Sequence, residues 1–427
     1  MALRKELGEL VAHSIISTQT AQDIERYYAA KQQPANGNLL LTIFGIVGSA
    51  LVGLGIILIF AHNWDDFTKP VKTGLAFLPL LLAQGLAAFC ILKKKSTAWK
   101  ESAATLLFFA VGASIALVAQ IYNLPGNLPA FICTWALLCL PLVYVLQSQM
   151  SVILTLIFAT WYAGQFSFSH SQTPWMYLVF IAALLPLYLN RLKLEPNSNF
   201  VTVMGWLLPV SAGLALTGFL QEAGLSTLLL YMALCCLSYN ISNLPVFAKN
   251  HRAATGYRAC GLLGMVIILV ISSFHGAWQI GLYIGIARDN DLYVCSILLI
   301  SAISCAVIIY RQTRAASIYM LMTLLFPALF YTVLLSDILP AIAANLLLLA
   351  TSILTIKRGI DRVDFKVLNF GLLLIALQVS CRFFDLDMSF ALRGLMFLAV
   401  GAGFFTANYA LAKKKKNNTL IPQPHEN

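Results

Sequence analysis

From residue 38 to residue 412 the chain alternates apolar stretches with short polar connections. The hydrocarbon core of a bilayer is about 30 Å thick, so an α-helix needs about 20 apolar residues to cross it. The pattern therefore predicts an all-α, polytopic transmembrane bundle of about 14 helices. Their predicted spans are Leu39–Ala61, Val71–Leu92, Ser102–Ile121, Leu128–Leu146, Met150–Phe166, Trp175–Leu189, Phe200–Leu220, Ser226–Leu244, Cys260–Ile280, Leu292–Tyr310, Ala315–Leu335, Leu339–Ile356, Val367–Cys381 and Met388–Leu411. The fifth, sixth and eighth are short or interrupted by polar residues, so a bundle of about 12 helices is the alternative.

The two ends of the chain differ from the bundle. Leu7 and Leu10 recur at helical spacing among charged residues, and Ser17 begins a second helix that is predicted to run to Ala30. A helical pair on the membrane surface is favoured over a module that binds a partner protein. The sequence thus divides into a cytoplasmic amphipathic segment (1–37), the transmembrane bundle (38–412) and a cytoplasmic tail (413–427) that is basic, then polar and disordered.

The composition agrees with a chain whose solvent is mostly lipid. Hydrophobic residues make up 59% and charged residues 11%, whereas a soluble domain has about 45–50% and about 25%. A soluble enzyme, a secreted disulfide scaffold and a disordered chain are excluded. No Cys-x-x-Cys pair or cofactor motif is present, so the nine cysteines are interpreted as packing residues, and no metal site or cofactor is predicted.

The net charge of +11 comes largely from basic residues in the loops on one side of the predicted helices. With a cytoplasmic N-terminus, 23 of the 28 basic residues fall on one side of the predicted helices. The other five are Lys69, Lys72, Arg288, Arg382 and Arg393. Because cytoplasmic loops are enriched in Lys and Arg, this asymmetry predicts an even number of helices with both termini in the cytoplasm. The positive net charge is therefore interpreted as a result of how the protein is oriented in the membrane, and not as a sign that it binds nucleic acid.

Glycines and embedded polar residues are predicted to join helices. Gly261 and Gly264 offer a small surface that lets a neighbouring helix approach closely in lipid. Asn345 and Gln378 are predicted to form interhelical hydrogen bonds. His275, near the outer end of the ninth segment, is interpreted as structural or interfacial.

The predicted outer face carries the candidate site. The first outer loop contributes His62, Asn63, Trp64, Asp65 and Asp66; the second contributes Gln120, Tyr122 and Asn123; and the C-terminal half contributes Asp337, Arg382 and Arg393. Two interpretations compete. The loop tips are simply solvated, or their carboxylates and arginines converge on an outward-facing pocket for a cation, a phosphate or a general base.

Arg393 is the most deeply placed of these charges. It follows Asp387 by six positions, about 9 Å along a helix. A charge inside the hydrocarbon costs at least about 2.5–3.5 kcal/mol at the membrane centre. The guanidinium therefore either pairs with a carboxylate in the bundle interior or extends toward the outer headgroups.

The N-terminal third resembles a known family. The resemblance rests on Leu7-Gly8-Glu9-Leu10-Val11, on Gly53-Leu54-Gly55-Ile56 leading to Ala61-His62-Asn63-Trp64-Asp65, and on Gly112-Ala113-Ser114-Ile115 leading to Gln120-Ile121-Tyr122-Asn123-Leu124-Pro125-Gly126. Over residues 1–150 these runs are similar to bacterial multi-pass membrane proteins with domain of unknown function 2157. The resemblance implies a bacterial cytoplasmic membrane protein, and it implies no reaction or substrate.

Three functions are compatible with these features. The leading hypothesis is a transporter, or flippase-like handler, of a small polar or lipid-linked envelope compound, and not an enzyme. The alternative is a membrane-embedded transferase for a lipid-linked substrate, with Asp65 or Asp66 as base and Arg382 or Arg393 binding phosphate. The third is a non-catalytic scaffold whose N-terminal helices bind a partner.

Overall fold

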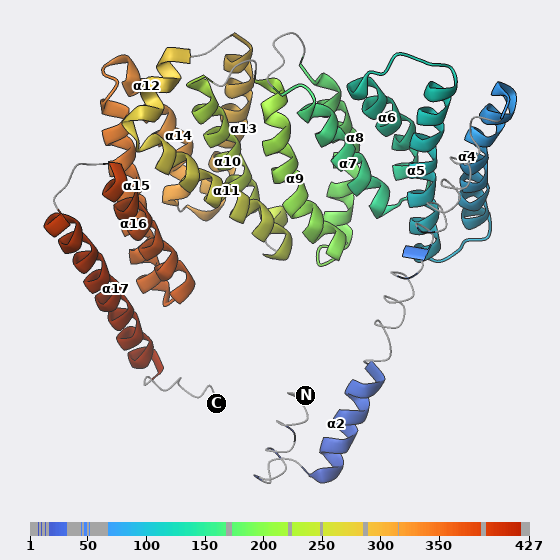
Figure 1. The fold of residues 1–427 in the computed structure, drawn as a ribbon. Helices are drawn as coiled ribbons and strands as arrows, with labels where there is room; N and C mark the ends of the chain where they lie inside the picture. Colours follow the sequence, from blue (N-terminus) through green and yellow to red (C-terminus); the bar gives the residue numbers. More distant parts are fainter. Residues whose placement is uncertain are drawn as a thin grey trace. The chain divides into compact units, whose positions relative to one another are not determined.

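The fold is seen in a computed structural model of the 427-residue chain (Figure 1). The structure describes residues 7, 10, 13, 17–31, 44, 47, 48, 51, 67–167, 173–220, 224–247, 251–284, 289–314, 316–385 and 390–419. All regular structure within these residues is helical. The predicted all-α class is therefore confirmed.

The helices follow the predicted apolar segments closely. They are α2 (Thr18–Lys31), α4 (Lys69–Leu92), α5 (Thr97–Ile121), α6 (Leu128–Val145), α7 (Gln149–Gly164), α8 (Trp175–Leu194), α9 (Asn199–Phe219), α10 (Ser226–Ser242), η2 (Pro245–Phe247), α11 (His251–Ser272), α12 (His275–Ile284), α13 (Asp289–Thr313), α14 (Ile318–Tyr331), η3 (Thr332–Leu334), α15 (Leu339–Arg362), α16 (Phe365–Asp385) and α17 (Phe390–Thr419). Among the described residues, ten helices are long and apolar enough to span a membrane, and Gln149–Gly164, Ser226–Ser242 and Ile318–Leu334 are shorter apolar helices. Most of the first predicted segment lies outside the described residues.

Several helices continue past their predicted ends. α8 runs to Leu194, α15 to Arg362 and α17 to Thr419, so each carries Lys or Arg in or beyond its last apolar turn. Long basic side chains allow this because they keep the charge in water while the helix continues. The lysines after residue 412 thus prolong α17, where a tail was expected, and residues 420–427 lie outside the described part.

The ninth predicted segment is the main correction to the helix map. In place of one helix over Cys260–Ile280, α11 ends at Ser272 and α12 begins at His275. Ser273 Oγ donates to the Val270 carbonyl at 2.6 Å, and the buried Trp278 Nε1 donates to the Ser272 carbonyl at 2.7 Å. The Trp278 bond satisfies the Ser272 carbonyl where the helix ends, and the Val270 carbonyl accepts from the Ser273 amide as well, at 3.1 Å.

The chain divides into two compact units, described separately. The first comprises residues 1–126 and 144–150. In it, Ser17 Oγ accepts from the Thr20 amide at 3.1 Å and caps α2, at the predicted helix start. Helices α4 and α5 form an antiparallel pair, in which the buried Ser114 hydroxyl donates to the Ala76 carbonyl at 2.8 Å.

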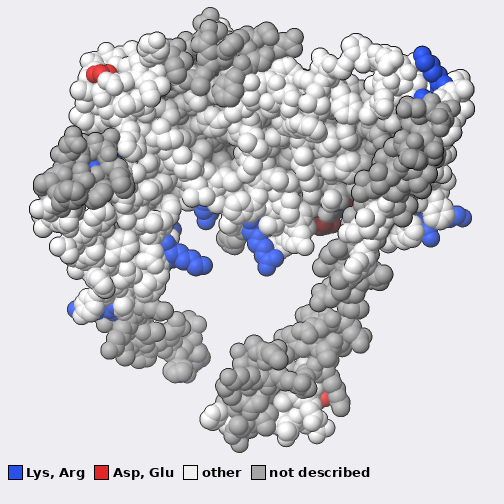
Figure 2. Space-filling view, viewed as in Figure 1, with Lys and Arg blue, Asp and Glu red and all other residues white. Residues whose placement is uncertain are grey.

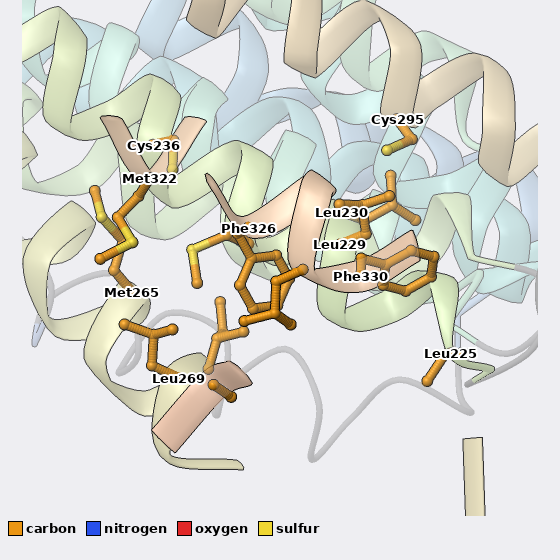
Figure 3. Close-up of a cluster of buried hydrophobic side chains, with 14 of the residues drawn as sticks. Leu225, Leu229, Leu230, Cys236, Met265, Leu269, Cys295, Met322, Phe326 and Phe330 are labelled. Atoms are coloured by element: carbon orange, nitrogen blue, oxygen red, sulfur yellow. The ribbon is translucent and has the colours of Figure 1, made fainter. Parts of the chain in front are cut away.

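The second unit comprises residues 127–143 and 151–427. Helix α10 packs against α11, α13 and α14, while α15 packs against α11, α14 and α16. One apolar cluster in this unit joins α10, α11, α13 and α14, and includes Met322 and Phe326, both fully buried (Figure 3). This packing holds together the helix ends that form the candidate site.

Glycine permits the closest helix contacts of the second unit. A Cβ built on Gly261 of α11 would lie 2.7 Å from the Tyr239 nitrogen and 2.8 Å from the Cys235 oxygen of α10. At the α9–α11 contact, a Cβ on Gly205 would lie 2.5 Å from the Ala253 oxygen. The predicted role of Gly261 in helix packing is confirmed.

Several basic side chains of the second unit lie at one set of helix ends, whereas Arg382 lies at the other. Arg191 and Lys193 are in the last turn of α8, Arg311 in that of α13 and Arg362 in that of α15. Figure 2 shows Lys and Arg side chains along the lower margin of the unit. These are the ends assigned to the cytoplasm by the sequence, and the cytoplasmic location of both termini stays a prediction.

Candidate functional site

Polar side chains from α12, α15 and α16, and from the connections that precede α12 and α15, lie near the ends of α11, α12, α15 and α16. We call this group the Ser273 cluster, and its members are Ser273, His275, Asp337, Asn345, Gln378 and Arg382. All six residues belong to the second unit. They lie at the helix ends opposite those that carry Arg191, Arg311 and Arg362.

Ser273, in the break between α11 and α12, is the centre of the cluster. Its backbone oxygen accepts from Asn345 Nδ2 of α15 at 2.9 Å, and its hydroxyl oxygen accepts from Arg382 Nη2 of α16 at 3.1 Å. Ser273 itself is 2% exposed. One residue at the end of α11 therefore connects two other helices, which requires the helix to stop there.

Arg382 has a fixed orientation. Its guanidinium carbon lies 4.5 Å from the centroid of the Phe274 ring, a cation–π contact, while Nη2 bonds to Ser273. Arg382 is also the last residue of the apolar span of α16. The charge is therefore held at the membrane edge by an aromatic face and a hydroxyl group.

The two embedded amides form interhelical bonds, as predicted. Asn345 Nδ2 donates to Ser273 and also to the Ala341 carbonyl at 2.9 Å, and Gln378 Nε2 donates to the Asn345 carbonyl at 2.9 Å. Two buried oxygen atoms nearby, Gln378 Oε1 and Ser272 Oγ, have no hydrogen-bond partner among the described residues. Buried polar atoms of this kind are where ordered water or a ligand group is expected.

His275 and Asp337 make a side-chain contact within the cluster. His275 Nε2, in the first residue of α12, lies 3.2 Å from Asp337 Oδ2 in the connection before α15. The two side chains are 37% and 47% exposed. Because solvent screens a pair this exposed, it holds α12 only weakly.

Large apolar side chains on α12 and on residues 334–338, the segments that carry His275 and Asp337, are exposed. Tyr283 of α12 is 94% exposed and Leu335 of the α14–α15 connection 79%. Ile280, Leu334 and Ile338 are also exposed. Exposed apolar and aromatic residues beside polar groups are typical of the membrane–water interface.

A second polar group, the Tyr319 cluster, occupies the opposite ends of α10, α14 and α15. Its members are Tyr239, Ser317, Tyr319, Thr355 and Arg358. Tyr319 Oη lies 2.6 Å from Thr355 Oγ1, Tyr239 Oη lies 3.1 Å from Ser317 Oγ, and Arg358 Nη2 donates to the Ala316 carbonyl at 3.1 Å. Both ends of α15 are thus tied to neighbouring helices by polar bonds.

The candidates from the sequence divide into four groups, of which Gln120, Tyr122 and Asn123 form the last. Asp337 and Arg382 belong to the same cluster, together with His275. The first-loop residues His62, Asn63, Trp64, Asp65 and Asp66 lie outside the described residues. Arg393 lies on α17, and its side chain is not among those described. The hypothesis of one pocket for all the outer charges therefore stays a prediction.

Gln120, Tyr122 and Asn123 have a structural function in the first unit. Asn123 adopts a left-handed φ of 51°, its amide donates to the Gln120 carbonyl at 3.3 Å, and the Leu124 amide donates to the Ala119 carbonyl at 2.9 Å. These bonds form a Schellman motif that ends α5. The Tyr122 hydroxyl lies 3.2 Å from Thr73 Oγ1 of α4.

Sequence reasoning missed Ser273 and Phe274, which orient Arg382. The available signal was the Ser272-Ser273 pair inside an apolar run, since serine hydroxyls compete for backbone groups and favour helix ends. Phe274 gave no signal, because an aromatic residue near a predicted helix end is ordinary. Among the described residues, no group of three His, Cys, Asp or Glu side chains is arranged to hold a metal ion.

Comparison with known proteins reaches only part of the chain. No curated protein and no solved structure matches it. The family match covers α2, α4, α5, α6 and the start of α7, so the Ser273 cluster lies outside it. Residues 8–152 match the model of a family described as predicted membrane protein (DUF2157), and the resemblance drawn from the sequence is confirmed for this third of the chain.

Proposed function

We propose that this multi-pass membrane protein is a transporter, or flippase-like handler, of a small polar or lipid-linked envelope compound in the bacterial cytoplasmic membrane. The observation that carries the proposal is the helix break at Ser272–Phe274 beside Arg382. Secondary transporters commonly bind their substrates where a membrane helix is interrupted, because the interruption frees backbone groups for recognition.

The two polar clusters support a protein that opens alternately at its two ends. Asn345 of the Ser273 cluster and Arg358 of the Tyr319 cluster are 13 residues apart on α15, about 20 Å along its axis. The apolar cluster around Phe326 packs against α15 between them. Polar bonds at each end and apolar packing between them suit rocking of helices about a central contact.

Transport in proteoliposomes tests the proposal. Fluorescent lipids, and radiolabelled small solutes in a separate series, would be followed across vesicles that contain the purified protein. We expect protein-dependent movement of one class, reduced by Arg382→Gln. The matched control is Arg191→Gln, which removes a surface pair with Glu195 on α8.

Two results would reject the proposal. One is absence of protein-dependent movement, combined with unchanged envelope lipids and exported metabolites in a deletion strain. The other is equal loss of transport in the Arg382 and Arg191 variants. The transferase and scaffold alternatives stay predictions, since Asp65 and Asp66 lie outside the described residues.

A further inference from the structure

We propose that the connection between α4 and α5 binds the headgroups of anionic phospholipids in the membrane leaflet at this end of the two helices. We call this surface the Lys93 patch, and its basic members are Lys93, Lys94, Lys95 and Lys100. The patch belongs entirely to the first unit. It lies in a different part of the chain from the Ser273 cluster, so lipid binding there does not depend on the proposed transport.

The backbone holds three of the lysines on one tight turn. The Lys94 amide donates to the Ile91 carbonyl at 3.1 Å and the Lys95 amide donates to the Cys90 carbonyl at 3.0 Å, and these bonds form a Schellman motif that ends α4. Lys94 has a left-handed φ of 47°, a conformation that favours glycine or asparagine. Three consecutive lysines therefore project from a turn of defined geometry.

The start of α5 is fastened to the end of α4. The buried Cys90 thiol donates to the Trp99 carbonyl at 3.7 Å, and the two helices pack against each other. Lys100 follows Trp99 in the first turn of α5 and is partly buried, whereas residues 93–99 are all exposed. Four lysines thus lie within the eight residues 93–100, between two helix ends that are joined to each other.

The ammonium groups of the patch form no ion pair with the described residues. Lys95 Nζ lies 5.1 Å from the centroid of the Phe89 ring, a cation–π contact that leaves its charge uncompensated. Another basic helix end differs in this respect, because Arg191 at the end of α8 pairs with Glu195 at 3.1 Å. The Lys93 patch therefore concentrates unpaired positive charge.

The acidic residue that follows the patch does not neutralise it. Glu101 Oε1 accepts from the Gln149 amide at 2.8 Å, while Oε2 accepts from Ser148 Oγ and from the Met150 amide at 3.0 Å. Both carboxylate oxygens are thus bound to the start of α7. Four positive charges face this single negative charge, so the connection attracts anions.

The surroundings of the lysines favour lipid as the anion. The apolar span of α4 ends at Leu92, directly before Lys93, and the span of α5 begins at Thr97. Leu92 is 79% exposed and Trp99 is 52% exposed. Exposed apolar and tryptophan side chains beside lysines are typical of the membrane–water interface. A soluble polyanion would leave Leu92 and Trp99 without a contact, so we commit to a phospholipid as the occupant.

Quenching by brominated lipids measures which lipid contacts Trp99. The full-length protein with Trp99 as its single tryptophan is placed in mixed phosphatidylcholine and phosphatidylglycerol vesicles, with bromine near the carboxyl end of the acyl chains of one lipid at a time. One lysine near an anionic surface contributes about fivefold in binding. We therefore expect the association constant at Trp99 to be at least about fivefold larger for phosphatidylglycerol than for phosphatidylcholine.

Two controls test whether the preference is local and present in the unaltered protein. A full-length protein with Trp175 as its single tryptophan, 60% exposed at the start of α8, is expected to be quenched equally by the two lipids. Native mass spectrometry of the wild-type protein in detergent is expected to show more retained phosphatidylglycerol than phosphatidylcholine. The preference is also expected to fall with added sodium chloride, since salt screens exposed charges.

Variants assign the preference to the patch. Lys93→Gln combined with Lys94→Asn removes two charges, and asparagine tolerates the left-handed conformation at position 94. This variant is expected to lower the ratio of the two association constants at Trp99 to about one. The matched control combines Arg191→Gln with Lys193→Gln, which removes two charges from the end of α8 and is expected to leave the ratio unchanged.

Four results would overturn the proposal. The first is equal quenching of Trp99 by the two lipids, and the second is an unchanged ratio in the Lys93 and Lys94 variant. The third is an equal loss in the Arg191 and Lys193 variant, which would show general charge attraction without a specific surface. The fourth is a larger fall with inorganic phosphate than with sodium chloride of the same ionic strength, which would identify free phosphate as the occupant.

Discussion

Replacement of Gly261 by alanine tests the packing of α10 against α11. The new Cβ would lie 2.7 Å from the Tyr239 nitrogen and 2.8 Å from the Cys235 oxygen, and both atoms belong to the backbone of α10. Ordinary van der Waals contact begins at 3.4 Å. The two helices must therefore separate locally by about 0.7 Å, the difference between 3.4 and 2.7 Å, because no side-chain rotation relieves the contact.

The expected cost follows from two opposing terms. Overpacking of a well-packed interior costs about 1–3 kcal/mol. Alanine is about 0.8–1.0 kcal/mol more favourable than glycine within a helix, which offsets part of this cost. We expect Gly261→Ala to lower the free energy of unfolding by about 1–2 kcal/mol.

The measurement is unfolding in mixed detergent micelles, followed by tryptophan fluorescence. Gly213→Ala on α9 is the matched control, since a Cβ there has no atom within 4 Å. This control is expected to be neutral or to gain up to about 1 kcal/mol. If both variants were equally stable, the close approach of α10 and α11 at Gly261 would be refuted.

Four further predictions follow from other contacts. Glu101 accepts hydrogen bonds from Ser148 Oγ and, at 2.8 Å, from the Gln149 amide. Glu101→Ala is therefore expected to lower the local stability of the start of α7 by about 2 kcal/mol and to speed amide hydrogen exchange there about 30-fold. Unchanged exchange would contradict this. Val363 has a φ of 54°, which β-branched residues tolerate poorly. Val363→Gly is therefore expected to stabilise the protein by about 1 kcal/mol or more, measured by unfolding in the same detergent micelles. A loss of stability would refute the backbone strain at this residue. A double-mutant cycle of His275→Ala and Asp337→Asn is expected to give a coupling below about 1 kcal/mol that falls with added salt, whereas a larger coupling would show a rigid bond. Alkaline phosphatase is expected to be active when fused in the α14–α15 connection and inactive in the α15–α16 connection; the reverse pattern would invert the predicted orientation.

The fold was largely predictable because lipid restricts the possible structures. A spanning segment must satisfy its backbone bonds internally, so apolar length alone locates helices such as α4 and α15. The break in the ninth segment was not predictable in this way. Its residues are apolar enough to continue a helix, and the break is stabilised by the long-range bond between Asn345 and Ser273 and by the local bond between Trp278 and Ser272.

The candidate site was predictable only in part. Alternation of the loops assigned Asp337 and Arg382 to the same side, although they are 45 positions apart. Their shared neighbours Ser273 and Phe274 depend on side-chain geometry, which periodicity does not contain. Polarity alone also did not show that the run from Gln120 to Asn123 ends helix α5, and its role in a site stays a prediction.

Because Trp278 is buried, its fluorescence can report whether α12 stays packed against the rest of the protein. Trp161, Trp175 and Trp206 are exposed, whereas Trp278 is fully buried and donates to the Ser272 carbonyl. Brominated lipid tails quench only the indoles that they touch. In a variant that keeps Trp278 as its single tryptophan, the fluorescence should therefore remain unquenched while α12 is packed in place. It should be quenched when α12 moves away and an acyl chain contacts the indole.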